Sequence, residues 1–124
     1  QCTDLKTLYC DKNELTALDL TKCIELRDLD CGNNKLKELD VSQCARLEYL
    51  FCRYIGLTML DVSQCVDLKG LYCNNNNLTT LDVTKCTELS KLNCSNNKLT
   101  TLDIRQCSKL DGLYCDENVQ VVRE

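Results

Sequence analysis

Cysteine is the residue type with the most chemical potential in this chain of 124 residues, which contains 12 cysteines and no histidine. The cysteines are spaced alternately by 8 and 13 residues, so they form two columns of a repeat. Thiols can form disulfides, bind metal ions or fill a core as small hydrophobic groups. The first cysteine column is Cys10, Cys31, Cys52, Cys73, Cys94 and Cys115, and the second is Cys2, Cys23, Cys44, Cys65, Cys86 and Cys107.

The spacing favours the third of these roles. Parallel neighbours about 4.8 Å apart present in-register cysteines poorly for a disulfide, which needs a torsion of roughly 90°. The sequence contains no C-x-x-C pair, which weakens the case for a metal site. We therefore expect reduced, buried thiols in both columns, with no metal and no cofactor. Some disulfides, or a metal-binding or redox-active array, are the alternatives.

The sequence offers no set of catalytic residues. It has no G-x-S-x-G motif and no glycine-rich phosphate loop, and its carboxylates are spread along the chain rather than paired. Buried thiols without a basic neighbour are unreactive. These observations predict no catalytic residues and a protein that is not an enzyme.

The aromatic residues give the clearest functional signal. Four of the six occupy one column, namely Tyr9, Phe51, Tyr72 and Tyr114. We expect Tyr49, Phe51 and Tyr72 to form one outward-facing patch, because they occupy outward positions of neighbouring strands. This patch is a candidate binding site, since tyrosine and arginine are enriched at binding hot spots. Simple cross-strand pairing of aromatic residues is the alternative. The full candidate ligand-binding set is Tyr49, Phe51, Arg53, Tyr54, Tyr72, Asp28, Asp30, Lys91, Asn93, Tyr9 and Tyr114.

These residues are positioned by a repeat of 21 residues, whose copies begin at residues 2, 23, 44, 65, 86 and 107. Each copy has the frame C-x-x-L-x-x-L-x-C-x-x-N-x-L-x-x-L-D. The segment that ends at each cysteine of the first column should be a short strand with alternating inward and outward side chains. Six such strands predict a narrow parallel sheet in one solenoid domain over residues 1–124.

Two polar columns accompany the leucines. An asparagine recurs three residues after each first-column cysteine except in the third copy, where Ile55 replaces it. There we expect an altered turn with one or two backbone groups that need other partners. The asparagines, which should turn the chain and bond to adjacent coils, are Asn13, Asn34, Asn76, Asn97 and Asn118.

The aspartate column should cap the turns that follow it by accepting backbone N–H bonds, with calcium binding as the alternative. Its members are Asp19, Asp40, Asp61, Asp82 and Asp103.

The two ends of the array and the net charge limit the kinds of partner that we expect. The first copy carries all the apolar core residues of the repeat with nothing polar to cover them, which predicts that an amino-terminal cap is missing. At the other end, residues 116–124 predict a degenerate polar last turn with Gln120 and Arg123 at core positions. The net charge is −4 with both signs interspersed, which disfavours nucleic acid. No apolar run approaches the roughly 18 residues that cross a membrane, so we expect no membrane insertion.

The motif L-x-x-L-x-C-x-x-N-x-L-x-x-L-D-V-S resembles the repeats of bacterial surface leucine-rich repeat proteins, the internalins above all, and similar arrays in secreted proteins of gut Bacteroidetes. The resemblance covers essentially the whole chain. It implies a solenoid of the α/β type, mainly strand and coil: a right-handed horseshoe with the six-stranded parallel sheet on its concave face. It also implies a cysteine ladder formed by the first cysteine column, an asparagine ladder, and an extracellular or bacterial cell-surface location.

Together these patterns predict a non-enzymatic binding or adhesion module. It would recognise a protein, peptide or glycan ligand on the concave face. The alternative is a structural protein that self-associates end to end by stacking its solenoid ends.

Overall fold

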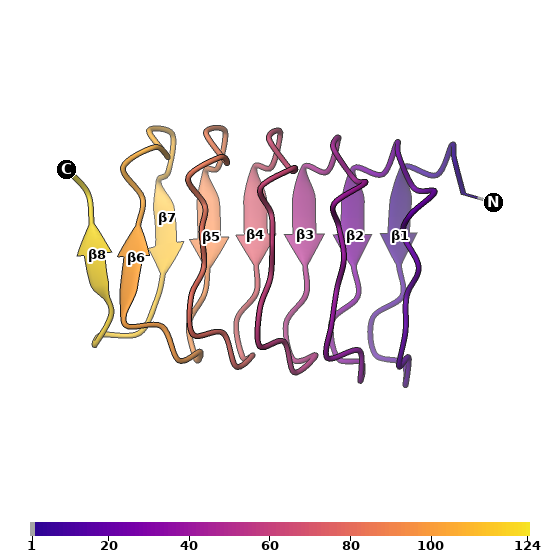
Figure 1. Cartoon of the computed structure of the whole chain (residues 1–124), viewed down its shortest axis with the longest axis horizontal. Helices are drawn as coiled ribbons and strands as arrows, with labels where there is room; N and C mark the ends of the chain where they lie inside the picture. Colours follow the sequence, from indigo (N-terminus) through magenta and orange to yellow (C-terminus); the bar gives the residue numbers. More distant parts are fainter. Residues whose placement is uncertain (1) are drawn as a thin grey trace.

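The computed structural model describes residues 2–124 as a stack of coils that carry short strands (Figure 1). Gln1, which the sequence places at the start of the domain, lies outside the described residues. No helix occurs in the described chain, so none is long and apolar enough to cross a membrane. The strands are β1 Thr7–Tyr9, β2 Asp28–Asp30, β3 Tyr49–Phe51, β4 Gly70–Tyr72, β5 Lys91–Asn93, β6 Thr101–Asp103, β7 Gly112–Tyr114 and β8 Gln120–Val122.

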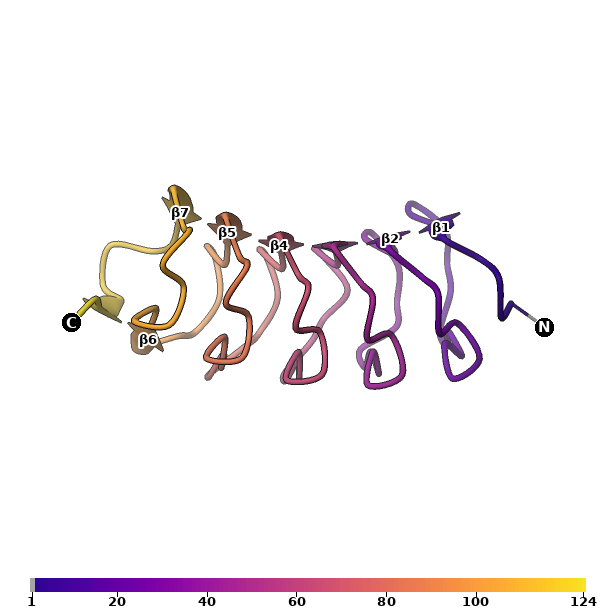
Figure 2. The same ribbon diagram turned by 90° about the horizontal axis from the view of Figure 1, so that it is seen from above.

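Six of these strands form the predicted parallel sheet, in the order β1-β2-β3-β4-β5-β7. Neighbours pair in the register of the repeat, so Leu29 lies opposite Leu50 and Phe51 opposite Tyr72. Figure 2 shows this sheet on one side of the array, and β6 and β8 on the other. We call the outer surface of the six-stranded sheet the strand face, and the opposite surface, which carries β6, the back face.

The core between these faces consists of leucine and cysteine columns. Within β3, Leu50 is fully buried while Tyr49 and Phe51 point outward, as the period of two requires. Leu29, Leu71 and Leu92 repeat this arrangement in the neighbouring coils. Each leucine is covered by the adjacent coils, so burial of about 1.5–3 kcal/mol per side chain accumulates only between neighbours.

The predicted asparagine ladder links the coils through buried side chains. Asn76 accepts hydrogen bonds from the N–H groups of Ile55 (3.1 Å) and Leu57 (3.0 Å). Its Nδ2 donates to the carbonyls of Cys52 and Cys73, each at 3.0 Å. Asn34 and Asn97 make equivalent bonds. Asn13 donates within its own coil.

Ile55 alters the turn as predicted. Its side chain is buried, with 2% exposed, and supplies no acceptor for the coil before it. Among the described residues, the Leu36 N–H therefore has no acceptor, whereas the equivalent Leu15 N–H bonds to Asn34. The chain compensates by moving Lys37 and Gly56 into the left-handed region, at φ 64° and 77°, and the Lys37 N–H donates to the Ile55 carbonyl at 2.8 Å.

The carboxyl-terminal coil differs from the prediction in two respects. Asn118 is exposed and makes no ladder bond within residues 2–124; the Asp116 carboxylate instead accepts bonds from the N–H groups of Asn96 and Asn97. The placement of Gln120 and Arg123 at core positions was also wrong.

The physical reason is a coil that closes two residues early. β8 pairs in parallel with β6, so Val121 lies opposite Leu102, a separation of 19 residues rather than 21. Val119 and Val121 therefore turn toward the core, and Gln120 and Arg123 are exposed. The repeat frame alone did not reveal this second, two-stranded sheet.

Replacing Asn76 tests the ladder. Asn76→Ala should lower the free energy of unfolding by about 3–5 kcal/mol, because it removes five hydrogen bonds and leaves buried backbone groups unpaired. Asn118→Ala is the matched control and should change it by less than about 0.5 kcal/mol. Urea unfolding followed by circular dichroism measures both. Equal effects of the two variants would show that the ladder bonds do not stabilise the array.

Candidate functional site

The centre of the strand face is an aromatic stack across β3 and β4. The rings of Phe51 and Tyr72 lie parallel, with an interplanar angle of 1° and centroids 4.5 Å apart. The two residues are direct cross-strand partners, and the ring separation matches the strand spacing of about 4.8 Å. Both side chains are half-buried. The register of the sheet therefore produces the stack, and the stack covers part of each ring.

Arg53 covers the other side of Phe51. Its Cζ lies 5.7 Å from the centre of the Phe51 ring, within the range of a cation–π contact. The side chain reaches toward the preceding coil, where a Cβ on Gly32 would lie 3.3 Å from the Arg53 Cγ. Tyr72 comes from the following coil. Phe51 is thus held between Tyr72 on one face and a guanidinium on the other.

Tyr49 extends the aromatic surface over β4. A Cβ built on Gly70 would lie 2.9 Å from Cδ1 of Tyr49 and 3.1 Å from Cε2 of Tyr72, so both rings use the space that this glycine leaves. Tyr49 remains 39% exposed. The structure thus brings Tyr49, Phe51, Arg53 and Tyr72 together, and we call these four residues the central patch.

The charged candidates flank the central patch. Asp28 and Asp30 lie opposite Tyr49 and Phe51 in the sheet. On the other side, Lys91 bends over Gly112 and binds Asp111 at 2.8 Å. This ion pair raises the pKa of Lys91 and lowers that of Asp111. Asn93 accepts hydrogen bonds from the backbone and hydroxyl of Ser95.

The remaining aromatic candidates lie outside the central patch. Tyr9 and Tyr114 are 67% and 66% exposed on the outer coils of the strand face, separated from the stack by Asp30 and Asn93 respectively. Tyr54 is 53% exposed in the turn after β3, with a left-handed φ of 56°.

Two glycines complete the site and were missed by sequence reasoning. Gly70 and Gly32 accept the side chains of Tyr49 and Arg53 from the adjacent coil. For Gly70 the available signal was a glycine in the outward column of the strand, directly beside Tyr49 of the neighbouring strand; Gly32 follows its strand and gave no such signal. Glycine has no side chain to pack in a strand, and there it often marks the close approach of another group.

The thiols of the first cysteine column are buried in its four central coils, and Cys10 and Cys115 are half-buried. Burial, together with the neighbouring thiols and Asp30, raises the pKa of Cys31 to about 12. Burial, with Cys115 next in effect, also raises the pKa of Cys94 to about 12. These thiols remain protonated at neutral pH and therefore unreactive.

The second cysteine column departs from the expectation of free thiols throughout. Cys2 and Cys23 form a disulfide, with their Cα atoms 5.3 Å apart, whereas Cys44, Cys65, Cys86 and Cys107 are free. The prediction was wrong for this pair because it applied the spacing of the sheet to a turn. The backbone of Cys23 bonds to groups three residues away along the chain, so the distance between coils there is not fixed by the sheet.

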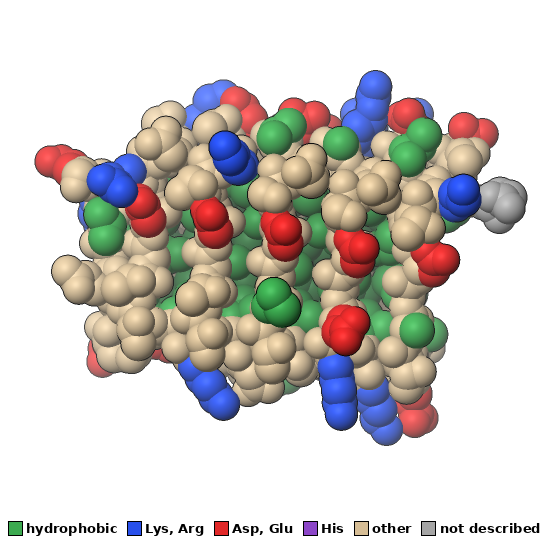
Figure 3. Space-filling model, viewed as in Figure 1, with side chains coloured by type: hydrophobic (Ala, Val, Ile, Leu, Met, Phe, Trp, Pro, Cys, Tyr) green, Lys and Arg blue, Asp and Glu red, His purple; other side chains and the backbone are tan. Residues whose placement is uncertain are grey.

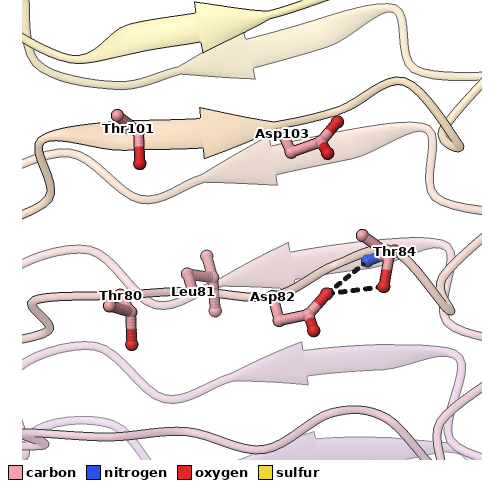
Figure 4. A pocket seen from close by; sticks show the side chains of 6 residues that line it. All are labelled: Thr80, Leu81, Asp82, Thr84, Thr101 and Asp103. Carbon is pink, nitrogen blue, oxygen red and sulfur yellow. Dashed lines mark hydrogen bonds between the residues drawn. The ribbon is translucent and has the colours of Figure 1, made fainter.

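The back face carries a row of aspartates (Figure 3) that cap turns as predicted. Asp82 accepts bonds from the N–H (2.9 Å) and hydroxyl (2.6 Å) of Thr84, as Figure 4 shows. The other four accept an N–H two residues later. Hydrogen bonds to the side chain and backbone of residue 105 lower the pKa of Asp103 to about 2. The bonded residue two positions later also lowers the pKa of Asp19, Asp40, Asp61 and Asp82.

Two grooves run between coils on the back face. One has a volume of about 300 Å³ and is lined by Thr80, Leu81, Asp82, Thr84, Thr101 and Asp103 (Figure 4). The other, of about 380 Å³, lies between Asp61 and Asp82 and includes Met59. Each lining aspartate uses Oδ1 for its own turn. Within residues 2–124, no group of three or more metal-binding side chains gathers.

Comparison with known proteins agrees with this architecture. A family model described as Leucine Rich Repeat matches residues 88–112. No curated protein matches the sequence significantly. The solved structure of internalin C2 from Listeria monocytogenes is 22% identical with a TM-score of 0.79, and the match covers 96% of this chain and 54% of that one.

Two further structures share the fold. A leucine-rich repeat protein of Leptospira interrogans is 26% identical (TM-score 0.69), with coverage of 96% of this chain and 38% of that chain. TLR13, solved in complex with ssRNA13, is 22% identical (TM-score 0.75), with coverage of 94% and 21%. The chain spans between 21% and 54% of the lengths of these three proteins.

The 21-residue coils and the parallel sheet give this chain the fold of a leucine-rich repeat solenoid, and the family model matches one segment of it. The fold is similar to that of internalin C2. Solenoids of this kind present extended surfaces for recognition.

The aspartate caps predict a pH dependence of stability. Their pKa values are lower in the folded protein than the ordinary value of 3.8, so their stabilising effect is complete above about pH 4 and is lost as the pH falls through the folded pKa. Tm should fall between about pH 4 and 2. Asp82→Asn keeps an acceptor oxygen but does not titrate, so calorimetry should show a smaller fall. An unchanged pH profile would contradict the capping role.

Proposed function

We propose that this solenoid is a non-enzymatic recognition module that binds a protein or peptide segment on the strand face, over the central patch. The observation that carries the proposal is the Phe51–Tyr72 stack with Arg53 against it. The leucines on the inner side of the same strands form the core, so the outward aromatic residues are not needed to build it. Aromatic and arginine side chains clustered on an outer surface are the composition of an interaction hot spot.

The geometry of the rings favours a protein over a glycan. Both faces of Phe51 are covered, one by Tyr72 and the other by Arg53. The patch therefore presents ring edges, tyrosine hydroxyls and a guanidinium rather than an open pair of aromatic faces. Such groups suit the mixed apolar and hydrogen-bonding surface of a protein segment.

Charge next to the central patch indicates what the segment carries. Asp28 and Asp30 have no ion-pair partner among residues 2–124, although other acidic side chains, such as Glu48 and Asp111, are paired. A basic residue of the ligand placed beside its apolar anchor would complement these two carboxylates.

The central patch lies away from the two ends of the array, so a ligand could bind there without involving the surfaces used in end-to-end stacking. Phe51 and Tyr72 lie in the third and fourth strands of six, away from both ends of the sheet. An extracellular or cell-surface location is part of the proposal. The Cys2–Cys23 disulfide supports it, because disulfides persist in oxidising compartments.

A random peptide library displayed on phage tests the proposal. Peptides selected on the wild-type protein should bind the double variant Phe51→Ala/Tyr72→Ala at least about 10-fold more weakly, since hot-spot truncations cost more than about 1.4 kcal/mol. Asp28→Asn should weaken the same peptides less and reduce the salt dependence of their affinity. Surface plasmon resonance measures each affinity.

Met59→Ala is the matched control, since Met59 is 74% exposed on the back-face groove. It should leave the affinities unchanged, and circular dichroism should show all variants folded. Selected peptides that bind the double variant as tightly as the wild type would refute the proposed site. Selective binding of a glycan or an RNA, with no peptide enriched, would refute the ligand class.

A further inference from the structure

The Cys2–Cys23 bridge lies in a column in which the local backbone geometry of Cys23 recurs at four further cysteines. We propose that the second cysteine column is a disulfide-forming column, in which Cys44 bonds to Cys65 and Cys86 bonds to Cys107, while the first cysteine column stays reduced. This inference is independent of the proposed binding function. It gives the second column a role that neither the leucine-rich repeat frame nor the relatives assign.

The backbone around each cysteine of the column is nearly the same as at Cys23. The Cys23 N–H donates to the carbonyl three residues earlier at 2.9 Å. Cys44, Cys65, Cys86 and Cys107 make the same bond at 2.9–3.0 Å. The carbonyl of each also accepts the N–H of the leucine three residues later, at 3.1–3.3 Å. A disulfide that fits one pair of consecutive coils therefore meets the same backbone at the other pairs.

The two columns differ in what fixes the distance between coils. In the first column, backbone bonds cross between coils: the Cys31 N–H donates to Phe51 and the Cys52 N–H donates to Tyr72, each at 2.9 Å. In the second column the N–H and carbonyl of each cysteine bond to backbone groups only three residues away along the chain. No backbone–backbone hydrogen bond of these cysteines therefore fixes the distance between coils there. The 5.3 Å between the Cα atoms of Cys2 and Cys23 falls in the usual disulfide range.

The free sulfurs already lie against the preceding coil. The Cys65 Sγ contacts the Val41 carbonyl at 3.8 Å, and the same carbonyl accepts the Cys44 N–H. The Cys107 Sγ lies 3.6 Å from the Val83 carbonyl, which accepts the Cys86 N–H. The Cys86 Sγ makes the same contact with the Val62 carbonyl and also lies 3.8 Å from the Cys65 carbonyl. Each sulfur thus lies beside the turn that holds the preceding cysteine of the column, and the choice between neighbouring pairs rests on the bridge that exists.

Pairing follows from the bridge that exists. With Cys2 and Cys23 bonded, four cysteines of the column remain. Pairing Cys44 with Cys65 and Cys86 with Cys107 leaves no thiol single, whereas a Cys65–Cys86 bond would leave two. Cys44 begins the coil that contains Phe51 and Cys65 begins the coil that contains Tyr72. The Cys44–Cys65 bridge would therefore join the two coils of the aromatic stack.

The reaction needs a disulfide oxidant such as oxidised glutathione. One protein thiolate attacks a glutathione sulfur and releases one glutathione; the second protein thiolate then attacks the mixed disulfide and releases the other. Two protein thiols are oxidised and one glutathione disulfide is reduced to two thiols. Burial raises the pKa of Cys44 to about 11 and that of Cys65 to about 12. The bridges therefore form while the chain folds, before the coils close.

Peptide mapping after oxidative refolding tests the proposal. The full chain is reduced, unfolded, and refolded with reduced and oxidised glutathione; free thiols are then alkylated in denaturant. Lysines and arginines place every cysteine in a separate tryptic peptide, so each link can be assigned by mass spectrometry without reduction. We expect three links, Cys2–Cys23, Cys44–Cys65 and Cys86–Cys107, and alkylation of all first-column cysteines. Compared with protein refolded under reducing conditions, Tm should rise by roughly 5–10 °C.

Two variants act as controls. Cys65→Ser should leave Cys44 alkylated and the other two links intact, and Cys52→Ser should leave all three links intact. The map of the unmodified chain decides the question even if a variant does not fold. The proposal is overturned by a map in which Cys44, Cys65, Cys86 and Cys107 are all alkylated, by a Cys65–Cys86 link, or by any link within the first column.

Discussion

Contact between successive coils is the constraint on which the rest of this structure depends. No coil encloses a core by itself: Leu29, Leu50 and Leu71 are fully buried only because the coils on either side cover them. The 21-residue register keeps these side chains aligned, and Asn34, Asn76 and Asn97 connect the backbones of adjacent coils. Stability is therefore a sum over neighbouring coils, and any residue outside the contact columns is free to vary.

That division explains how one short chain can carry both a ladder and an exposed aromatic patch. Within β3, Leu50 belongs to the core and its neighbours Tyr49 and Phe51 belong to the strand face. The register that aligns the leucines also places Phe51 opposite Tyr72, so the two outward rings stack without any additional structural element. The aromatic patch is thus a by-product of alignment, and its chemistry depends on which residues fill the outward columns.

The sequence predicted the features that depend on the repeat. The six-stranded sheet, the buried leucines, the aspartate caps and the altered turn at Ile55 all follow from the period and from the chemistry of each column. The gathering of Tyr49, Phe51 and Tyr72 also followed from their columns. Whether these residues bind a ligand remains a proposal.

The features that were missed depend on departures from the repeat. The pairing of β6 with β8 arises because the last coil is two residues shorter, which moves Val121 inward and removes Asn118 from the ladder. The Cys2–Cys23 disulfide depends on the backbone bonds of the turn, which spacing alone does not reveal. The fit of Tyr49 over Gly70 depends on the direction in which a side chain leans between coils.

The central claim is that the two sides of each strand have separate duties, and one comparison of unfolding free energies tests it directly. Leu50→Ala should lower the free energy of unfolding by about 2–5 kcal/mol, because it opens a cavity between coils. The triple variant Tyr49→Ala/Phe51→Ala/Tyr72→Ala should cost less than half as much, since exposed cross-strand pairs contribute about 0.2–1 kcal/mol each. A triple variant as destabilised as Leu50→Ala would show that the aromatic residues hold the fold together, and would contradict the account.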